Sequence, residues 1–379
     1  MKITIIGSAH PLRGGLATFN ERLALALQEQ GHDVVMYSFS LQYPSFLFPG
    51  KTQLTDEPAP ENIKIHTAIN SVNPLNWLSV GNRIKNERPD LILIKYWLPF
   101  MGPAFGTILR QVRKNRHTRV LCIVDNIIPH EKRPGDTAFT KYFVKTVDAF
   151  LTMSRDVLED LKLFTTKPKV YHPHPLYDNY GPGVSKEEAC RKLGVDSNKK
   201  YILFFGFIRK YKGLDILFEA MKDERIRAAG IELIVAGEYY GDQEMYEQLV
   251  VQYQIKNQLH LFTDFIPNSE VRYYFSAADL VVQPYRSATQ SGITQIAYHF
   301  EKPMVVTNVG GLAEGVPDGK VGFVTEPYAK DIADAILKFY QPNALPALQE
   351  NLLEEKRKYS WESFTKTLFS TVFNDQNKV

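Results

Sequence analysis

The chain has 379 residues, of which 44% are hydrophobic and 23% are charged, and its net charge at pH 7 is +3. This composition is typical of a folded globular protein with two domains and excludes an intrinsically disordered chain. The small net charge does not provide the excess of positive charge that is typical of nucleic-acid-binding proteins, so we expect no nucleic-acid partner.

The sequence also bears on cellular location. Cys122 and Cys190 lie in segments without the spacing of a metal or redox motif, which favours free thiols in a reducing compartment. An apolar strand follows directly after the first two residues, so we expect no signal peptide. The apolar run at residues 91–109 contains Lys95 and two prolines, which argues against a membrane span. We therefore expect a cytoplasmic protein.

The first segment reads as a strand, a glycine loop, a helix and a second strand. Apolar residues recur at helical spacing from Leu16 to Leu27, and Gly31 ends the helix. Gly14 and Gly15 precede this helix and let a ligand approach the backbone closely, although an ordinary tight turn is the alternative. The loop does not match GxGxxG, and no acidic residue ends the next strand, so a dinucleotide site of the dehydrogenase type is disfavoured.

The rest of the first half alternates strands and helices. Residues 41–62 read as a surface loop, and strands are predicted at 63–67, 91–95, 119–124 and 149–153. This alternation predicts the α/β class with a parallel doubly wound sheet. Ligands bind at the carboxyl ends of such strands, which brings three loops together. These are Gly14-Gly15, Tyr96–Gly102 and Asp125–Glu131.

The Asp125–Glu131 loop carries the densest chemistry of the first half. Asp125, His130 and Glu131 follow a strand end, where a general base or an acceptor of sugar hydroxyls is well placed. The alternative is that Asp125 and Asn126 cap a turn while the other two side chains are solvated.

Two further patterns have simple alternatives. Residues Arg110–Arg119 contain five Arg and Lys directly after the apolar run, which is one way to dock on an anionic membrane surface. The alternative is a solvated helix end. His172 and His174 have no carboxylate or thiol at ligand spacing, so we expect a loop there and no metal site.

The second half begins after a polar segment at residues 178–200, which reads as a linker. The next strand is followed by Arg209 and Lys212. The forked guanidinium of Arg209 and the point charge of Lys212 suit a diphosphate, and the alternative is that these are ordinary basic loop residues. Strands at 232–238, 260–265 and 280–282 follow.

A turn and a helix from 291 to 300 come next, then a strand at 303–307. Ser291-Gly292 at the helix start leaves backbone N–H groups unpaired, and with the helix dipole these favour a phosphate. The alternative is an ordinary strand–turn–helix unit.

Together these segments resemble the retaining glycosyltransferases of the GT-B fold, specifically glycosyltransferase family 4, over nearly the whole chain. The motifs that carry the resemblance are Gly206-Phe-Ile-Arg209-Lys-Tyr-Lys212-Gly213, Gly237-Glu238, Ser291-Gly292, Lys302-Pro303 through Gly310-Gly311 to Glu314, and the tail Tyr359-Ser-Trp361-Glu-Ser-Phe364. The resemblance implies two Rossmann-like doubly wound domains that face each other across a cleft. Residues 1–180 would bind the acceptor and 181–359 the nucleotide sugar, with helix 360–379 crossing back to the first domain.

The resemblance also implies residue roles. Arg209 and Lys212 would bind the diphosphate and stabilise the leaving oxygen, so that no metal or other cofactor is needed besides the nucleotide diphosphate sugar as co-substrate. Asp125 and His130 would complete the catalytic set. The other donor-binding residues would be Gly14, Gly15, Gly206, Ile266, Ser287, Gln290, Ser291, Gly292, Ile293, Gln295 and Glu314. The acceptor-binding residues would be Tyr96, Trp97, Asn126 and Glu131.

The chain departs from the family pattern at two places. Ser287 and Gln295 stand where the family has a pair of glutamates, and a glutamine accepts a ribose hydrogen bond without charge assistance. Asp125-Asn126 stand where the family more often has His-Asn or His-Asp. An Asp there can accept a proton or orient a sugar hydroxyl, and the alternative is that the usual role passes to His130.

The sequence thus favours a hexosyltransferase-type enzyme, cytoplasmic or at the inner face of a membrane. It would transfer sugar from a UDP- or GDP-sugar to a glycan or lipid-linked acceptor in cell-surface polysaccharide or glycoconjugate synthesis. A non-catalytic nucleotide-sugar-binding module is the alternative, to which the substituted positions point and against which Arg209 and Lys212 argue. An epimerase would need further carboxylates, and a large phosphorylase would need a cofactor lysine and a longer chain.

Overall fold

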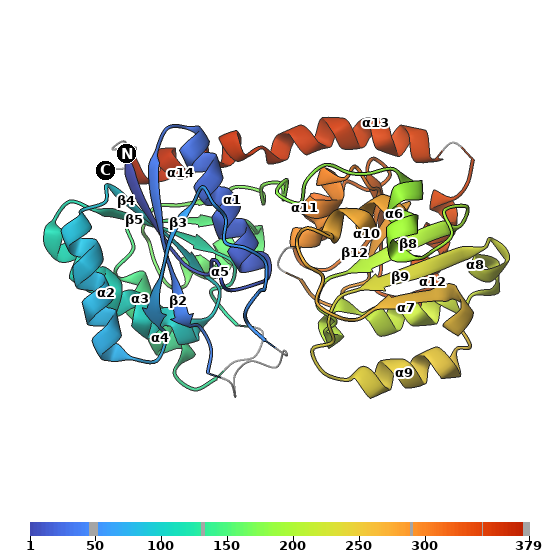
Figure 1. Ribbon diagram of the computed structural model, residues 1–379, viewed down its shortest axis with the longest axis horizontal. Coiled ribbons are helices and arrows are strands. Elements are labelled where there is room, and N and C mark those ends of the chain that lie inside the picture. Colours follow the sequence, from blue (N-terminus) through green and yellow to red (C-terminus); the bar gives the residue numbers. More distant parts are fainter. Residues whose placement is uncertain (45–51, 130–132, 289–290, 343, 374–379) are drawn as a thin grey trace. The chain divides into compact units, whose positions relative to one another are not determined.

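The computed structural model describes residues 1–44, 52–129, 133–288, 291–342 and 344–373 (Figure 1). The chain divides into two compact units. Unit 1 comprises Met1–Pro175 and Trp361–Val379, and unit 2 comprises Leu176–Ser360. The chain therefore changes unit a few residues before the boundary predicted at residue 180, and its last helix belongs to unit 1.

Unit 1 contains a sheet of seven parallel strands in the order β3-β2-β1-β4-β5-β6-β7. The strands are β1 (Lys2–Ile6), β2 (Asp33–Leu41), β3 (Lys64–Asn70), β4 (Leu91–Tyr96), β5 (Arg119–Val124), β6 (Ala149–Thr152) and β7 (Lys169–Tyr171). The helices are α1 (Gly15–Glu29), α2 (Pro74–Glu87), η2 (Pro99–Met101), α3 (Gly102–Val112), η3 (Arg113–Asn115), α4 (Asp136–Val144), α5 (Arg155–Lys162) and α14 (Trp361–Phe373). The predicted strands of this half are confirmed, and β7 was not predicted.

Unit 2 contains a sheet of six parallel strands in the order β10-β9-β8-β11-β12-β13. The strands are β8 (Lys200–Phe205), β9 (Ile231–Ala236), β10 (Leu259–Phe262), β11 (Leu280–Gln283), β12 (Met304–Thr307) and β13 (Gly322–Thr325). The helices are α6 (Lys186–Leu193), η4 (Lys210–Lys212), α7 (Leu214–Met221), α8 (Glu224–Ala228), α9 (Gln243–Gln252), η5 (Lys256–Gln258), α10 (Val271–Ala277), α11 (Gly292–His299), η6 (Ala313–Gly315), α12 (Ala329–Phe339), α13 (Ala344–Lys356) and η7 (Arg357–Tyr359).

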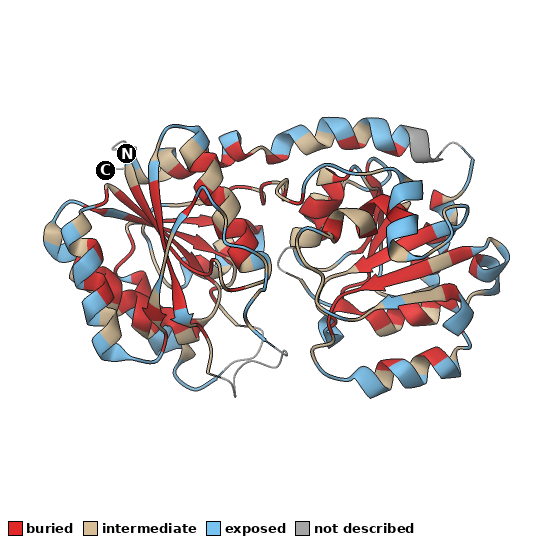
Figure 2. Cartoon of the chain, in the orientation of Figure 1, coloured by how far each residue is buried: buried red, intermediate tan, exposed pale blue. Residues whose placement is uncertain are grey.

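The apolar sequence pattern explains both sheets. Every residue of β4 and of β11 is buried, as expected where helices cover both faces of a parallel sheet (Figure 2). In unit 2 the inward helix positions predicted from the sequence, Leu214, Leu217, Phe218 and Met221, are fully buried in the core. Both cysteines are buried and free, as predicted.

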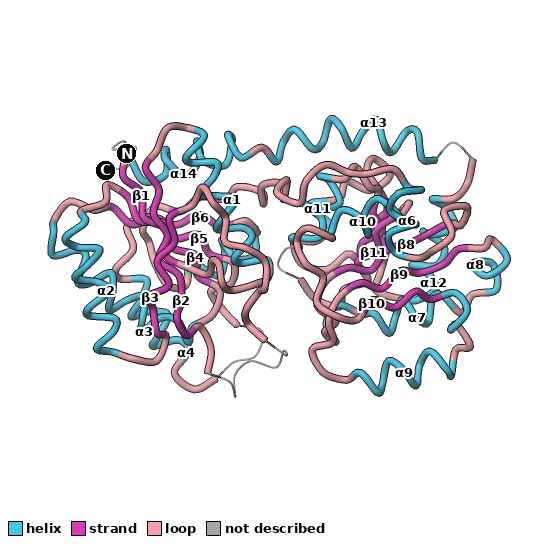
Figure 3. Tube along the Cα trace, viewed as in Figure 1, coloured by secondary structure: helices cyan, strands magenta, loops and turns pink. Residues whose placement is uncertain are grey.

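The strand order indicates at which point of each sheet a ligand is expected to bind. In unit 1 the order reverses between β1 and β4, and in unit 2 it reverses between β8 and β11 (Figure 3). Successive helices then cross on opposite sides of such a point, so the two loops leaving it diverge and a crevice opens at the carboxyl ends of the strands. The glycine loop after β1 and the basic loop after β8 both lie at such a point.

The two histidines near the end of unit 1 lie in the loop after β7, as expected, and pack against its core. The His174 ring is edge-on to Phe19 at 5.3 Å between ring centroids, and His172 Nε2 lies 3.1 Å from the Ser363 hydroxyl of α14. Burial, and secondarily the charge of Lys95, lower the pKa of His174 to about 3. Burial also lowers the pKa of His172.

These pKa shifts predict that unit 1 loses stability in acid. An unfolded histidine has a pKa of about 6.5, so below that pH the unfolded chain binds a proton that folded His174 excludes. The stability is fully present above pH 6.5 and falls towards pH 3, by at most about 1.4 kcal/mol per pH unit for one histidine. Urea unfolding from pH 7 to 4.5, followed by the fluorescence of Trp77, Trp97 and Trp361, which all belong to unit 1, measures this slope.

His174→Leu is the comparison, because it removes the titrating ring and leaves the apolar contact with Phe19. Its unfolding free energy should depend less steeply on pH than that of the wild type. Equal slopes in the two proteins would show that the buried His174 does not control the acid sensitivity.

Candidate functional site

In unit 2 the site is built where two glycines bring the chain segments after β8 and β9 into close contact. Gly206 has φ +94° and Gly237 has φ +144°. A Cβ on Gly237 would lie 2.3 Å from the Gly206 carbonyl oxygen, and a Cβ on Gly206 would lie 3.0 Å from Lys212 Nζ. Glycine is therefore required at both positions, and the Lys212 ammonium lies directly against the backbone of the strand end.

Lys212 is a buried cation, and none of the described residues supplies a charge to pair with it. Its side chain is 9% exposed, and its Nζ lies 5.7 Å from the centroid of the buried Tyr285 ring. Within the described residues Nζ forms neither an ion pair nor a hydrogen bond. Burial, and secondarily the charge of Arg209, lower the pKa of Lys212 to about 7. Such an uncompensated buried ammonium is costly for the fold and suits a site that receives an anion.

The neighbouring Arg209 is exposed, and its guanidinium lies over the Tyr240 ring at 4.5 Å from the centroid. The loop after β11 is attached to the same basic loop through Arg286. The Arg286 N–H donates to the Tyr211 carbonyl at 2.7 Å, and its guanidinium forms a fork with both Asp215 oxygens at 2.7 and 2.6 Å. This geometry holds the start of the loop after β11, at Arg286, against the loop that carries both cations.

Ser291 caps the start of α11. Its hydroxyl oxygen accepts the Ile293 N–H at 3.2 Å and donates to Gln283 Oε1 at 2.6 Å. Gln283 Nε2 in turn donates to the Thr294 hydroxyl at 3.1 Å. The prediction that the helix start leaves its N–H groups unpaired is therefore wrong for Ile293, because the serine side chain caps it. The Gly292 N–H, at the first helical position, has no intrahelical partner.

The remaining predicted donor residues lie in different environments. Gln295 is buried, and its Oε1 has no hydrogen-bond partner within the described part of the chain. Ser287 and Glu314 are exposed, and Ile266 is half-buried in the loop after β10. Gln290 lies outside the described residues.

In unit 1 the carboxyl ends of β1, β4 and β5 are adjacent, so the three predicted loops do start side by side. Gly14, with φ +99°, precedes α1 and accepts the N–H groups of Ala17 and Thr18, and Gly15 is exposed. The chain enters the first turn of α1 with a positive φ at Gly14, a conformation that glycine adopts more readily than other residues.

Asp125 at the end of β5 is paired with a residue that the sequence analysis did not assign to the site. Lys95 Nζ lies 3.0 Å from Asp125 Oδ1 and 3.5 Å from the centroid of the Phe19 ring. The Lys95 side chain is 3% exposed and that of Asp125 is 13% exposed. Burial lowers the pKa of Lys95, and the Asp125 carboxylate opposes this shift. A lone lysine inside the apolar run LILIKYW was the signal available in the sequence.

The structure corrects one predicted acceptor residue. Tyr96 is fully buried, stacked on Phe143 at 4.5 Å, with its hydroxyl 3.0 Å from that of Thr140. It is the last residue of β4 and faces the core, so it cannot contact an acceptor. Trp97 is half-buried and donates its indole N–H to the Tyr43 hydroxyl at 2.5 Å, and Asn126 is half-buried.

His130 and Glu131 lie outside the described residues. Elsewhere in the described ranges no three His, Cys, Asp or Glu side chains are grouped as a metal ion would require. None of the described helices combines the length and the apolar character that crossing a bilayer demands.

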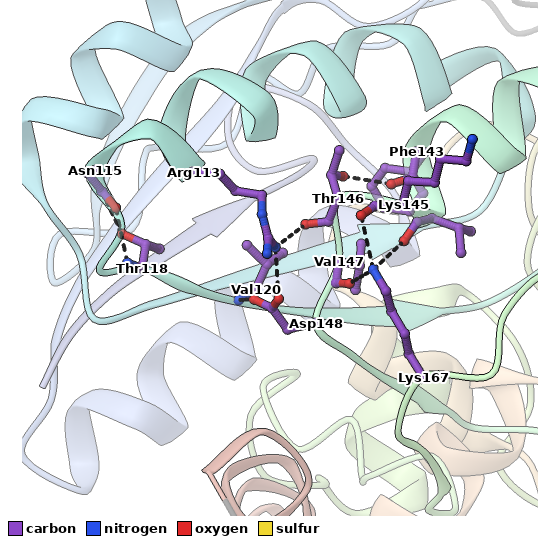
Figure 4. Close-up of polar contacts among 11 residues, drawn as sticks. Arg113, Asn115, Thr118, Val120, Phe143, Lys145, Thr146, Val147, Asp148 and Lys167 are labelled. Carbon is purple, nitrogen blue, oxygen red and sulfur yellow. Dashed lines mark hydrogen bonds and ion pairs between the residues drawn. The ribbon is translucent and has the colours of Figure 1, made fainter. Parts of the chain in front are cut away.

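Part of the basic segment Arg110–Arg119 is used within unit 1. Arg113 Nη1 donates to the Thr146 carbonyl at 2.9 Å and to Asp148 Oδ1 at 2.8 Å (Figure 4). Lys167 Nζ donates to the carbonyls of Val144, Lys145 and Val147 at the end of α4 in the same region. These contacts lie where β5 and β6 begin, at the edge of the sheet opposite to the ligand edge.

Arg110 is engaged in the same way. Its guanidinium stacks on the Tyr142 ring at 3.6 Å and donates to the carbonyls of Gly106 and Tyr142, each at 2.8 Å. Lys114, Arg116 and Arg119 remain exposed. The segment therefore contributes mainly to packing α3 against α4, and three of its cations face solvent.

Comparison with known proteins shows the family and the fold. Residues 13–173 match the family model Glycosyltransferase Family 4, and residues 185–359 match the family model Glycosyl transferases group 1. A D-inositol 3-phosphate glycosyltransferase of Corynebacterium aurimucosum is 26% identical over 218 residues, which are 55% of this chain and 51% of that relative. The matched part thus spans about half of that protein.

Two longer matches extend over nearly the whole chain. A putative teichuronic acid biosynthesis glycosyltransferase of Bacillus subtilis is 22% identical over 362 residues, 89% of each chain. The Anabaena protein HepE, solved in complex with UDP and glucose, has a TM-score of 0.72 at 14% identity, covering 98% of this chain and 100% of that one. The chain therefore belongs to the group 1 glycosyltransferases, with a family 4 first half, and has the GT-B fold of two parallel-sheet α/β domains.

Proposed function

We propose that this glycosyltransferase is of the hexosyltransferase type and transfers sugar from a UDP- or GDP-sugar to a glycan or lipid-linked acceptor. Retention of configuration and independence of a metal ion are part of the proposal. The observation that carries it is the buried Lys212 ammonium, which has no anionic partner in the described residues and lies at the switch point of the unit 2 sheet. The UDP complex of HepE supports UDP as the first nucleotide to test.

The diphosphate would be held by the two cations and the start of α11. Arg209 would contribute its exposed, forked guanidinium, and Lys212 would contribute its buried ammonium. Gly292 would donate its backbone N–H at the positive end of the helix dipole. The Gln295 Oε1, buried without a partner, would accept a ribose hydroxyl. Ser287 and Glu314, both exposed, would lie beside the transferred sugar and the phosphates.

In the reaction the bond between the anomeric carbon and the diphosphate oxygen breaks, and that oxygen gains negative charge. The oxygen of the acceptor hydroxyl forms the new bond to the anomeric carbon, and its proton passes to the departing nucleoside diphosphate. Arg209 and Lys212 would stabilise this charge more in the transition state than in the ground state, and this difference lowers the barrier. Removal of one such donor typically costs about 2–4 kcal/mol of transition-state stabilisation. A metal ion is not needed for this role if both cations act together.

Unit 1 would supply the groups that orient the acceptor. Lys95 keeps Asp125 paired from the buried side, at 3.0 Å, while the carboxylate remains partly exposed at the carboxyl edge of the sheet. Because carboxyl oxygens accept hydrogen bonds, Asp125 would hold and orient a hydroxyl of the acceptor sugar. The half-buried Asn126 and Trp97 would line the same edge.

Nucleotide binding tests the diphosphate site. Scanning calorimetry with UDP, GDP or ADP, each with EDTA and each with Mg²⁺, should show stabilisation by at least one nucleotide without the metal. At about 100 times the dissociation constant the gain is about 2.7 kcal/mol. Arg209→Ala should remove most of it, because the guanidinium contacts the phosphates.

Arg225→Ala is the matched control, since Arg225 is an exposed unit 2 arginine that is bound to Asp223 and Asp334. It should respond to the nucleotide like the wild type. Stabilisation only with Mg²⁺ would contradict metal independence. Binding by the wild type without turnover of any UDP- or GDP-sugar would favour the non-catalytic module, with Ser287 and Gln295 as its explanation.

Protonation of Lys212 should accompany binding. The free lysine has a pKa of about 7, and a bound diphosphate raises this pKa because it supplies the missing negative charge. At pH 8.5 the free side chain is mostly neutral, so binding should take up close to one proton. The affinity should fall by up to about tenfold per pH unit above the free pKa.

Titration calorimetry with UDP at pH 8.5, in buffers with different ionisation enthalpies, measures this uptake. Lys212→Met keeps the buried volume and should abolish the uptake and weaken binding. Proton uptake that persists in Lys212→Met would assign the titration to another group.

The proposal includes contact with an anionic membrane surface, although Arg110 and Arg113 are bound within unit 1. This contact would depend on Lys114, Arg116 and Arg119. Changing these three residues to Glu should reduce co-sedimentation with phosphatidylglycerol vesicles, since each cation near such a surface contributes about 1 kcal/mol. The same change at three exposed unit 2 lysines, Lys256, Lys320 and Lys330, should have no effect. Equal sedimentation of wild type and triple variant would end this part of the proposal.

A further inference from the structure

The chain segments after β8 and β9 remain paired beyond the edge of the unit 2 sheet. The Ile208 N–H donates to the Glu238 carbonyl at 2.8 Å, and the Tyr240 N–H donates to the Ile208 carbonyl at 2.9 Å. Ile208 and Tyr239 form a parallel bridge, and Ile208 is fully buried. The backbone of Tyr240 is therefore fixed relative to Arg209, the residue that follows Ile208.

This backbone pairing brings the ring of Tyr240 into contact with the guanidinium of Arg209. The guanidinium carbon lies 4.5 Å from the ring centroid, within the range of a cation–π interaction. The Tyr240 ring also contacts Phe207, at 4.6 Å between centroids and an interplanar angle of 51°. Phe207 also lies 6.4 Å from Phe265. The Tyr240 ring thus contacts both the guanidinium of Arg209 and the ring of Phe207.

Within the described residues the Arg209 guanidinium forms no ion pair and no hydrogen bond. Arg286 of unit 2 is held differently, by a fork on Asp215. A carboxylate partner would occupy the N–H groups and neutralise the charge, whereas an aromatic face holds the cation and leaves the N–H groups available.

We propose that Tyr240 is a positioning residue that holds Arg209 by its ring, so that the guanidinium meets the diphosphate with its N–H groups free. This inference rests on the proposed function, because it assumes that Arg209 binds the nucleotide. It adds a residue that neither the basic loop nor the glycine motifs indicate. The ring matters and the hydroxyl does not.

Titration calorimetry with UDP tests the inference in five proteins: wild type, Tyr240→Phe, Tyr240→Leu, Arg209→Ala and the double variant Arg209→Ala/Tyr240→Leu. Tyr240→Phe should bind UDP within about twofold of the wild type, because the aromatic face is kept. Tyr240→Leu should bind about 3–5-fold more weakly, as expected for loss of one exposed cation–π contact. In the Arg209→Ala background the same change should have no further effect, because the two residues act as one unit.

Tyr253→Leu is the control for loss of a ring under a cation, since Lys222 Nζ lies over Tyr253 at 5.0 Å elsewhere in unit 2. It should bind UDP like the wild type. Melting temperatures of all variants show whether each one folds, and Tyr240→Phe separates the ring from general packing.

The outcomes distinguish the two levels of the argument. If the wild type binds neither UDP nor GDP nor ADP, the proposed function and this inference both fall. If the wild type binds and Arg209→Ala binds more weakly, but Tyr240→Leu matches the wild type, only the positioning role is overturned. A loss in Tyr240→Leu that is repeated in the Arg209→Ala background, or an equal loss in Tyr240→Phe, also overturns it.

Discussion

The candidate site of unit 2 depends on a buried charge that no anionic group among the described residues compensates. Lys212 lies against the backbone of Gly206 and beneath the Tyr285 ring, and burial lowers its pKa to about 7. Keeping an ammonium there costs folding free energy that an anionic ligand can return. The close approach of Gly206 and Gly237 makes this placement possible, because no side chain intervenes between the strand ends. In the proposed function, Arg209 and the start of α11 would contact the same anion as Lys212.

The flanking contacts limit how the basic loop can move. The Arg286 fork on Asp215 attaches the loop after β11, and the paired backbone of Ile208 and Tyr240 attaches the segment after β9. Because these contacts order the loop before a ligand binds, less conformational entropy is lost on binding, as in other preorganised sites. Unit 1 shows the same principle in another form, since the buried Lys95 holds Asp125 at the carboxyl edge of its own sheet.

The sequence predicted what depends on local pattern. Strand and helix order, the parallel sheets and the basic loop all follow from apolar periodicity and from glycines next to strand ends. The short strands β7 and β13 carry too little pattern to be predicted. The sequence pattern predicts that the strand from residue 91 ends at residue 95, whereas β4 includes Tyr96, and the side chain of this last strand residue lies in the core. Lys95 and Tyr240 were missed, because their roles arise from partners that are distant in the sequence, Phe19 and Arg209.

The central claim is that the diphosphate of a nucleotide binds at the switch point between β8 and β11. A crystal structure of the chain with UDP tests it most directly. The account predicts phosphate oxygens within hydrogen-bond distance of Lys212 Nζ and of the Gly292 N–H, with the Arg209 guanidinium turned towards them and still in contact with the Tyr240 ring. UDP bound elsewhere, for example at the Gly14 loop of unit 1 with Lys212 Nζ still unpaired, would contradict it.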